Sequence, residues 1–147
     1  MNIHKNILLE KERKNILNFV KSKVKDLGSE YPGLQTDADL HKSKELLPLL
    51  NKIKKYYKNY KIHRCWANYT KGNIISWHSH SDVDISIVYY LNNVSNFGTM
   101  FKKQGDFIEI TECPQNSILI FNSKLVHSVP IHLEEDRYSI AIDLIKI

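Results

Sequence analysis

The sequence predicts a mainly β fold with N-terminal helices: a double-stranded β-helix (a cupin-like jelly roll) of about eight strands, buttressed by two helices. Over the first 60 residues, apolar side chains recur at helical spacing. From Lys61 onward the hydrophobic period becomes two and stays so. We therefore expect one domain over residues 1–147, with helical support over 1–60 and the jelly-roll core over 61–147.

The helical part begins with an amphipathic segment over residues 10–27, and Gly28 follows it as a helix stop. Residues 29–39 are rich in small and turn-forming residues and predict a loop. A second helix is expected over residues 40–58. Because proline has no backbone N–H to donate, Pro48 predicts either a kink in this helix or its true beginning.

Turn-forming residues separate the predicted strands. Examples are Lys71-Gly72-Asn73, Asn92-Asn93, Gln104-Gly105-Asp106 and Pro114-Gln115-Asn116. The strands between such turns are expected over residues 62–69, 74–80, 84–91, 98–103, 107–111, 117–121, 125–130 and 137–145.

The composition is that of an ordinary globular protein, with 42% hydrophobic and 25% charged residues. The apolar runs have strand length and no apolar signal core follows Met1, so we expect a cytoplasmic protein without a membrane span. Cys65 and Cys113 do not form a Cys-x-x-Cys pair and predict no disulfide framework. The net charge of +5 comes largely from lysines of the second helix, which favour a solvated helix face over a nucleic-acid surface. The sequence makes no prediction about oligomeric state.

Two histidines form the centre of the predicted site. His78 and His80 are two residues apart, so on a strand both imidazoles would point to the same face. His127 follows another strand, and a jelly roll can bring it opposite the first pair. Three neutral nitrogen donors suit Fe(II), Zn(II) or another borderline divalent ion. The alternative is a pair of structural histidines held by hydrogen bonds.

Arg137 predicts an anionic ligand beside this metal. A guanidinium can fork onto a carboxylate with two charge-assisted hydrogen bonds, and the Ser139 hydroxyl two residues along faces the same way. Tyr90 and Ser86 share one strand face and could add hydroxyl donors to the same carboxylate. A chelating organic ligand favours iron as the metal. The alternative is a surface arginine paired with the acidic residues 134–136.

With these residues in place, the chain resembles the Fe(II)/2-oxoglutarate-dependent oxygenases, in their prolyl-hydroxylase-like branch. The resemblance covers roughly Leu34 to the C-terminus, and Trp66-x-Asn68 with Trp77-His78-x-His80 is similar to a group of small bacterial and phage members. It rests on Tyr69-x-x-Gly72, His78-x-His80, Tyr89-Tyr90-Leu91-Asn92, Gly98-Thr99-Met100-Phe101, the segment 114–121, His127-x-Val129 and Arg137-x-Ser139.

The resemblance implies a role for each matched residue. Iron would be held by His78 and His127, the far carboxylate of 2-oxoglutarate would be bound by Arg137 with help from Tyr90 and Ser139, and Tyr69 would line the cosubstrate pocket.

This chain departs from the family at one ligand position, where His80 stands in place of the usual carboxylate. The site would therefore contain three histidines. Asp82 or Asp84 could coordinate instead. Asp84 has the same strand parity as His80 but lies about 13 Å further along a straight strand. We favour His80 as the ligand.

The activity that the resemblance implies is oxidation by O2, with Fe(II) as cofactor and 2-oxoglutarate as cosubstrate. Hydroxylation of a peptide side chain or a small metabolite is the expected outcome. One alternative is a three-histidine, cupin-type dioxygenase that does not use 2-oxoglutarate, in which Arg137 would bind the carboxylate of the substrate itself. Another is a non-catalytic, metal-binding jelly-roll module.

Overall fold

The computed structural model describes residues 1–28, 33–72, 75–129 and 135–147. Its helices are α1 (Glu10–Lys23) and α2 (Leu47–Tyr56), with short 3₁₀ turns at Leu40–Lys42, Lys44–Leu46 and Gln104–Asp106. Its strands are β1 (Asn2–His4), β2 (Leu34–Gln35), β3 (Tyr60–Thr70), β4 (Ile85–Asn92), β5 (Phe97–Lys102), β6 (Ile108–Glu112), β7 (Ser117–Asn122), β8 (His127–Ser128) and β9 (Arg137–Lys146).

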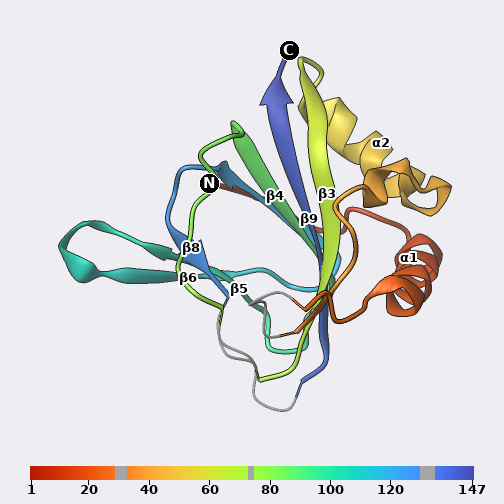
Figure 1. Ribbon diagram of the computed structural model, residues 1–147, viewed down its shortest axis with the longest axis horizontal. Coiled ribbons are helices and arrows are strands. Elements are labelled where there is room, and N and C mark those ends of the chain that lie inside the picture. The colour runs from red at the N-terminus through yellow and green to blue at the C-terminus, as the bar shows by residue number, and fades with distance from the viewer. Residues whose placement is uncertain (29–32, 73–74, 130–134) are drawn as a thin grey trace.

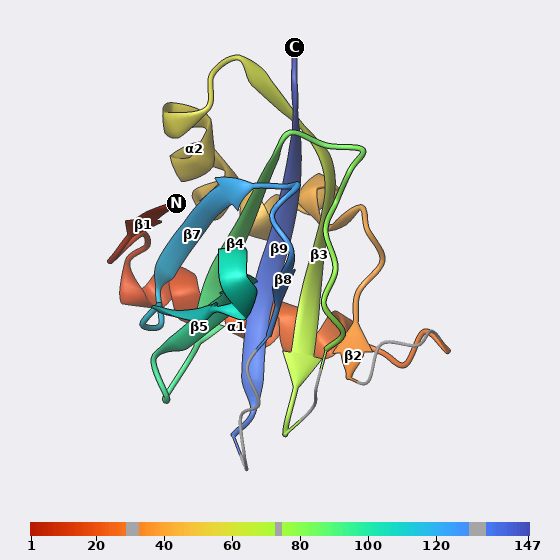
Figure 2. The same ribbon diagram turned by 90° about the vertical axis from the view of Figure 1, so that its left-hand side faces the viewer.

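The strands form two antiparallel sheets. The larger has the order β1-β7-β4-β9-β3-β2 and the smaller has the order β6-β5-β8. Both helices cover the outer face of the larger sheet, and the smaller sheet lies on its opposite side (Figures 1 and 2). This arrangement confirms a mainly β protein with two supporting helices and the architecture of a jelly roll. None of the helices in the described ranges has the length and hydropathy needed to cross a membrane.

The two faces of the larger sheet have different chemistry, because successive side chains of a strand point to opposite faces. In β9, Ile140, Ile142 and Leu144 are buried in the main core beneath the helices. The alternate residues of the same strand, among them Ser139 and Asp143, line a cavity between the sheets. The hydrophobic pattern of the strand therefore fixes which residues can contribute to a site.

Both helices differ from their predicted limits. The first ends at Lys23 rather than at residue 27, because the backbone of Lys25 leaves the helix and exchanges two hydrogen bonds with Gln35, at 2.9 and 3.0 Å. The second begins at Leu47 with Pro48 in its first turn, which confirms the second interpretation of that proline. The residues before it form 3₁₀ turns instead.

The strand predicted over residues 74–80 was wrong where the structure describes it, from Ile75 onward. Only His78 pairs, in an isolated bridge with His127. The backbone N–H of His80 instead donates to the Ser123 carbonyl at 2.8 Å. The strand predicted over 125–130 is reduced to β8, although Pro130 lies outside the described residues.

The first and second strands, β1 and β2, were not predicted. The short β2 lies within the segment expected to be a loop, of which residues 29–32 are not described. It forms an edge of the larger sheet beside β3. This position brings Gln35 to the wall of the cavity, where it becomes part of the candidate site.

A tight contact in the smaller sheet leads to a prediction about stability. Gly98 in β5 is buried, and a Cβ atom placed there would lie 2.4 Å from both Cys113 Sγ and Thr111 Oγ1. Because overpacking a filled core is unfavourable, we expect Gly98→Ala to lower the free energy of unfolding by about 1–3 kcal/mol. Urea unfolding followed by circular dichroism measures the change. An unfolding free energy equal to that of the wild type would contradict this packing.

Candidate metal centre

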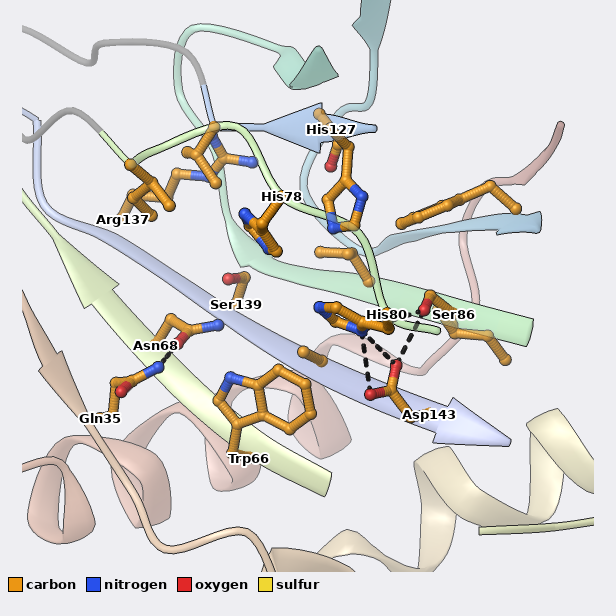
Figure 3. Close-up of a pocket in the computed structure, with 17 residues that line it drawn as sticks. Gln35, Trp66, Asn68, His78, His80, Ser86, His127, Arg137, Ser139 and Asp143 are labelled. Carbon is orange, nitrogen blue, oxygen red and sulfur yellow. Dashed lines mark hydrogen bonds and ion pairs between the residues drawn. The ribbon is translucent and has the colours of Figure 1, made fainter. Parts of the chain in front are cut away.

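Three histidines from two distant parts of the chain meet at one point. One potential ligand atom from each of His78, His80 and His127 lies within 4.8 Å of the others. The ring centroids are separated by 4.3 Å for His78 and His127, and by 5.2 Å for His80 and His127. Figure 3 shows the three rings facing a common space. The bridge between His78 and His127, with N···O distances of 3.0 and 2.8 Å, fixes their backbones side by side.

Every ring of this cluster has its Nδ1 atom hydrogen-bonded. His78 Nδ1 lies 2.8 Å from the Ser76 carbonyl, and His127 Nδ1 lies 2.8 Å from the Leu125 carbonyl. A carbonyl oxygen only accepts hydrogen bonds, so both Nδ1 atoms carry the proton. The Nε2 atoms therefore keep their lone pairs, which is the tautomer needed for a metal held through Nε2.

The protonation state of His127 also suits a metal. Burial lowers the pKa of this imidazole to about 4, so the ring is neutral at physiological pH. His80 is half-buried and His78 is exposed. Three imidazoles with free Nε2 lone pairs form a donor set that fits a borderline divalent ion.

The alternative carboxylate ligands lie elsewhere. Asp82 forks onto the guanidinium of Arg64, with distances of 2.8 and 2.9 Å. Asp84 accepts the backbone N–H of Lys146 at 2.8 Å. Neither carboxylate belongs to the histidine cluster within the described part of the chain, and His80 does.

Asp143 is a buried carboxylate that was not among the predicted site residues. It is 1% exposed and lies 3.1 and 3.0 Å from His80 Nδ1 through its two oxygens. The Ser86 hydroxyl donates to it at 2.8 Å, and Arg64 Nε donates at 2.7 Å. Burial alone would raise the pKa of Asp143, but the hydrogen bonds from His80, Ser86 and Arg64 hold it below its ordinary value. Strand parity with Arg137 was the available signal, since Asp143 lies six residues further along the same strand.

Arg137 lies in the wall of the same cavity. It is 3% exposed, so the surface position assumed in the alternative was wrong. Its guanidinium carbon lies 4.7 Å from the centroid of the Tyr90 ring. The cavity has a volume of about 140 Å³ and is lined, besides Arg137 and the three histidines, by Ser139 and by apolar side chains that include Ile75, Val88, Phe121 and Val129.

The remaining predicted hydroxyl groups have partners of their own. The Tyr90 hydroxyl lies 2.8 Å from Thr99 Oγ1 and accepts the Thr99 backbone N–H at 2.9 Å. The Ser86 hydroxyl donates a hydrogen bond to Asp143. Ser139 lines the cavity, as its position in the strand predicts.

Tyr69 does not lie where it was expected. Its neighbour Asn68 lines the cavity, and because strand residues alternate, Tyr69 faces the other side of β3. There its ring packs against Tyr138 with a centroid distance of 4.9 Å, and its hydroxyl donates to Asp136 at 2.6 Å. The residue is not part of the cavity lining.

A second hollow along β2 and β3 adjoins the cavity and shares lining residues with it. Gln35 and Asn68 line the cavity and share a hydrogen bond of 2.8 Å (Figure 3). Trp66 lines both the cavity and the adjoining groove, which has a volume of about 410 Å³ and also includes Arg64 and His80. Trp66 was not among the predicted site residues, although its strand parity with Asn68 could have indicated this position.

Comparisons with known proteins identify the fold. No protein-family model and no curated protein matches the sequence. A 2OG-Fe(II) oxygenase from Burkholderia pseudomallei has a similar structure, with a TM-score of 0.75 at 15% identity over 95% of this chain and 80% of the other.

Two further solved structures are similar and contain bound molecules. HygX from Streptomyces hygroscopicus, with nickel, 2-oxoglutarate and hygromycin B bound, has a TM-score of 0.74 at 11% identity, over 98% of this chain and 82% of the other. A prolyl hydroxylase from Trichoplax adhaerens, in complex with a peptide fragment of hypoxia inducible factor, has a TM-score of 0.73 at 16% identity, over 99% of this chain and 83% of the other. The fold of this chain is therefore that of the 2OG-Fe(II) oxygenases, prolyl hydroxylases among them.

Proposed function

We propose that the protein is a dioxygenase that depends on Fe(II) and 2-oxoglutarate and hydroxylates an organic substrate. The observation that carries this proposal is the combination of three histidines around one point with a buried arginine in the same cavity. The fold shared with known 2OG-Fe(II) oxygenases supports it.

In this proposal, His78, His80 and His127 would hold Fe(II) through their Nε2 atoms. The hydrogen bonds on the three Nδ1 atoms fix the ring orientations before the metal arrives, so little rotamer freedom is lost on binding. When bound, Fe(II) and 2-oxoglutarate would supply the oxidative chemistry, in which O2 is consumed, 2-oxoglutarate is converted to succinate and CO2, and a substrate C–H group becomes C–OH.

Arg137 binds a carboxylate of 2-oxoglutarate. Its guanidinium can form two parallel hydrogen bonds to a carboxylate, and these are stronger in a buried site than in water. The Tyr90 ring beneath the guanidinium limits its rotation. Ser139 lies two residues further along the cavity face of β9, and in this proposal it would donate its hydroxyl to the same carboxylate.

The apolar part of the lining excludes water from the reacting groups. Ile75, Val88, Phe121 and Val129 contribute no hydrogen-bonding side chains to the cavity. No residue is needed as nucleophile or general base for this reaction. The role of the protein is to bind and orient the metal, 2-oxoglutarate and the substrate, and to shield them from water.

The substrate enters along the groove that adjoins the cavity. The groove meets the metal centre at His80 and Trp66, which line both hollows. A peptide and a small molecule are both candidates, because the similar structures include one with a peptide and one with hygromycin B.

A three-histidine dioxygenase that does not use 2-oxoglutarate is the second candidate. The donor set favours it, because the cluster contains no carboxylate among the described residues. In that case Arg137 would bind the carboxylate of the substrate.

The test is a screen of peptides and small metabolites with Fe(II), 2-oxoglutarate and O2, in which succinate formation and oxygen uptake are measured together. We expect substrate-dependent succinate formation equal to the oxygen consumed. Oxygen uptake without succinate would favour the second candidate. Neither product nor uptake, in a protein shown to bind the metal, would contradict both.

A further inference from the structure

His80 differs from the other two histidines in the partner of its Nδ1 atom. His78 and His127 donate to neutral backbone carbonyls two residues earlier in the chain. His80 instead faces the carboxylate of Asp143, which reaches it from the middle of β9, 63 residues away in sequence. A charged partner makes an imidazole a stronger donor to a metal than a neutral partner does.

The Asp143 carboxylate is held in place from several directions (Figure 3). Besides His80, it accepts hydrogen bonds from Ser86 at 2.8 Å and from Arg64 at 2.7 Å. The other two nitrogens of Arg64 bind Asp82 at the surface. A negatively charged carboxylate that is 1% exposed needs hydrogen-bond donors and an opposite charge to offset its loss of water, and His80, Ser86 and Arg64 provide them.

The His80 ring is likewise fixed. Its backbone N–H donates to the Ser123 carbonyl at 2.8 Å, and Trp66 lies beside the ring with a centroid distance of 6.0 Å. An ionised carboxylate is only an acceptor, so it selects the tautomer of His80 with the proton on Nδ1. Nε2 is then left to face the cluster.

We propose that Asp143 is a positioning residue of the metal centre: through its hydrogen bond it sets the tautomer and orientation of His80, and it places one negative charge next to a site whose three ligands are neutral. The proposal rests on the metal site of the proposed function, not on its substrate. A metal bound by three imidazoles keeps its full charge of +2, and a carboxylate one hydrogen bond away partly compensates it.

The alternative is a purely structural role, in which Asp143 only anchors Arg64 to the sheet. The two interpretations differ in what Asp143→Asn does to metal affinity. We expect the dissociation constant for Co(II), measured by calorimetric titration of the full chain, to rise about 10- to 100-fold. The matched control is Asp82→Asn, which removes a carboxylate from the same Arg64 without touching His80 and should change the constant by less than about threefold.

The same substitution at Asp143 can also be made in the His80→Asp variant. In His80→Asp the ligand itself carries a negative charge, and Asp143 becomes a like charge beside it. Adding Asp143→Asn to that variant should therefore strengthen Co(II) binding, which is the opposite of its effect on the wild type. A purely structural role of Asp143 predicts weaker or unchanged binding in both backgrounds, and that result would overturn the proposal.

A measurement on the unmodified protein keeps the proposal testable where a variant does not fold. Long-range ¹H–¹⁵N spectra of the Zn(II)-loaded wild type should show the His80 proton on Nδ1 and the metal on Nε2. The opposite tautomer would overturn the proposal. Wild-type protein that binds no divalent metal would overturn the metal site as well, whereas normal binding with an unchanged Asp143→Asn would overturn only the role of Asp143.

Discussion

His127→Ala is expected to abolish tight metal binding. His127 is the buried member of the cluster, and its neutral ring is held by the Leu125 carbonyl and by the backbone bridge to His78. Changing only the partner of a metal ligand costs 10- to 100-fold in affinity, so removal of the ligand itself should cost more than about 100-fold. Calorimetric titration with Co(II) measures this loss.

A thermal scan supplies the control for folding. A ligand at 100 times its dissociation constant stabilises a protein by about 2.7 kcal/mol, so metal should raise the melting temperature of the wild type and leave that of His127→Ala unchanged. His63→Ala is the matched control, because His63 is an exposed strand histidine that lies outside the cluster. It should bind metal as the wild type does. Equal affinity in His127→Ala would contradict the three-histidine site.

Arg137→Ala is expected to remove 2-oxoglutarate binding while leaving metal binding intact. Truncating one partner of a buried, hydrogen-bonded charge pair costs 2–5 kcal/mol, so the dissociation constant for 2-oxoglutarate should rise by at least about 30-fold. Arg137 lies in the cavity wall and is not one of the clustered ligands, so the Co(II) affinity should stay within about threefold. Titration of the metal-loaded protein with 2-oxoglutarate measures the first constant.

Arg137→Lys separates charge from geometry. Lysine keeps the positive charge but lacks the planar fork that forms two parallel hydrogen bonds and stacks on Tyr90. We expect the affinity of Arg137→Lys for 2-oxoglutarate to lie between those of the wild type and Arg137→Ala. If Arg137→Ala bound 2-oxoglutarate as tightly as the wild type, the assignment of this arginine to the cosubstrate would be wrong.

The order of the main elements was predictable from the sequence, because the change from helical to alternating hydrophobic period is strong and long. The long strand β9 shows this well: its alternate residues separate into Ile140, Ile142 and Leu144 in the core and Ser139 and Asp143 in the cavity. Short elements were not predictable. The two-residue β2 has no period to detect, and tertiary pairing with β3 makes it a strand.

The histidine cluster was predictable in composition but not in its local structure. His78 and His80 were expected to converge because they share a strand face, yet the segment that carries them pairs only at His78. The convergence comes from contacts made by other segments, the carbonyls of His127 and Ser123. Such contacts join residues far apart in the chain and leave no signal in the local pattern.

Asp143 escaped the sequence analysis for a related reason. The motifs that indicated the site end at Ser139. A single carboxylate within an otherwise apolar strand does not by itself indicate a function. The pairing of β9 with β3 and β4 brings it opposite Arg64 and Ser86, and His80 meets it from the segment between β3 and β4. Tyr69 shows the opposite error, since a motif position placed it in the cavity and strand parity places it outside.

The most direct test of the central claim is an anaerobic titration of the Fe(II)-loaded wild type with 2-oxoglutarate, followed by visible absorption. We predict a weak charge-transfer band that saturates at one 2-oxoglutarate per bound iron, is absent in His127→Ala, and needs at least about 30-fold more 2-oxoglutarate in Arg137→Ala. Wild-type protein that binds Fe(II) but gives no band, or a band that Arg137→Ala leaves unchanged, would contradict the account.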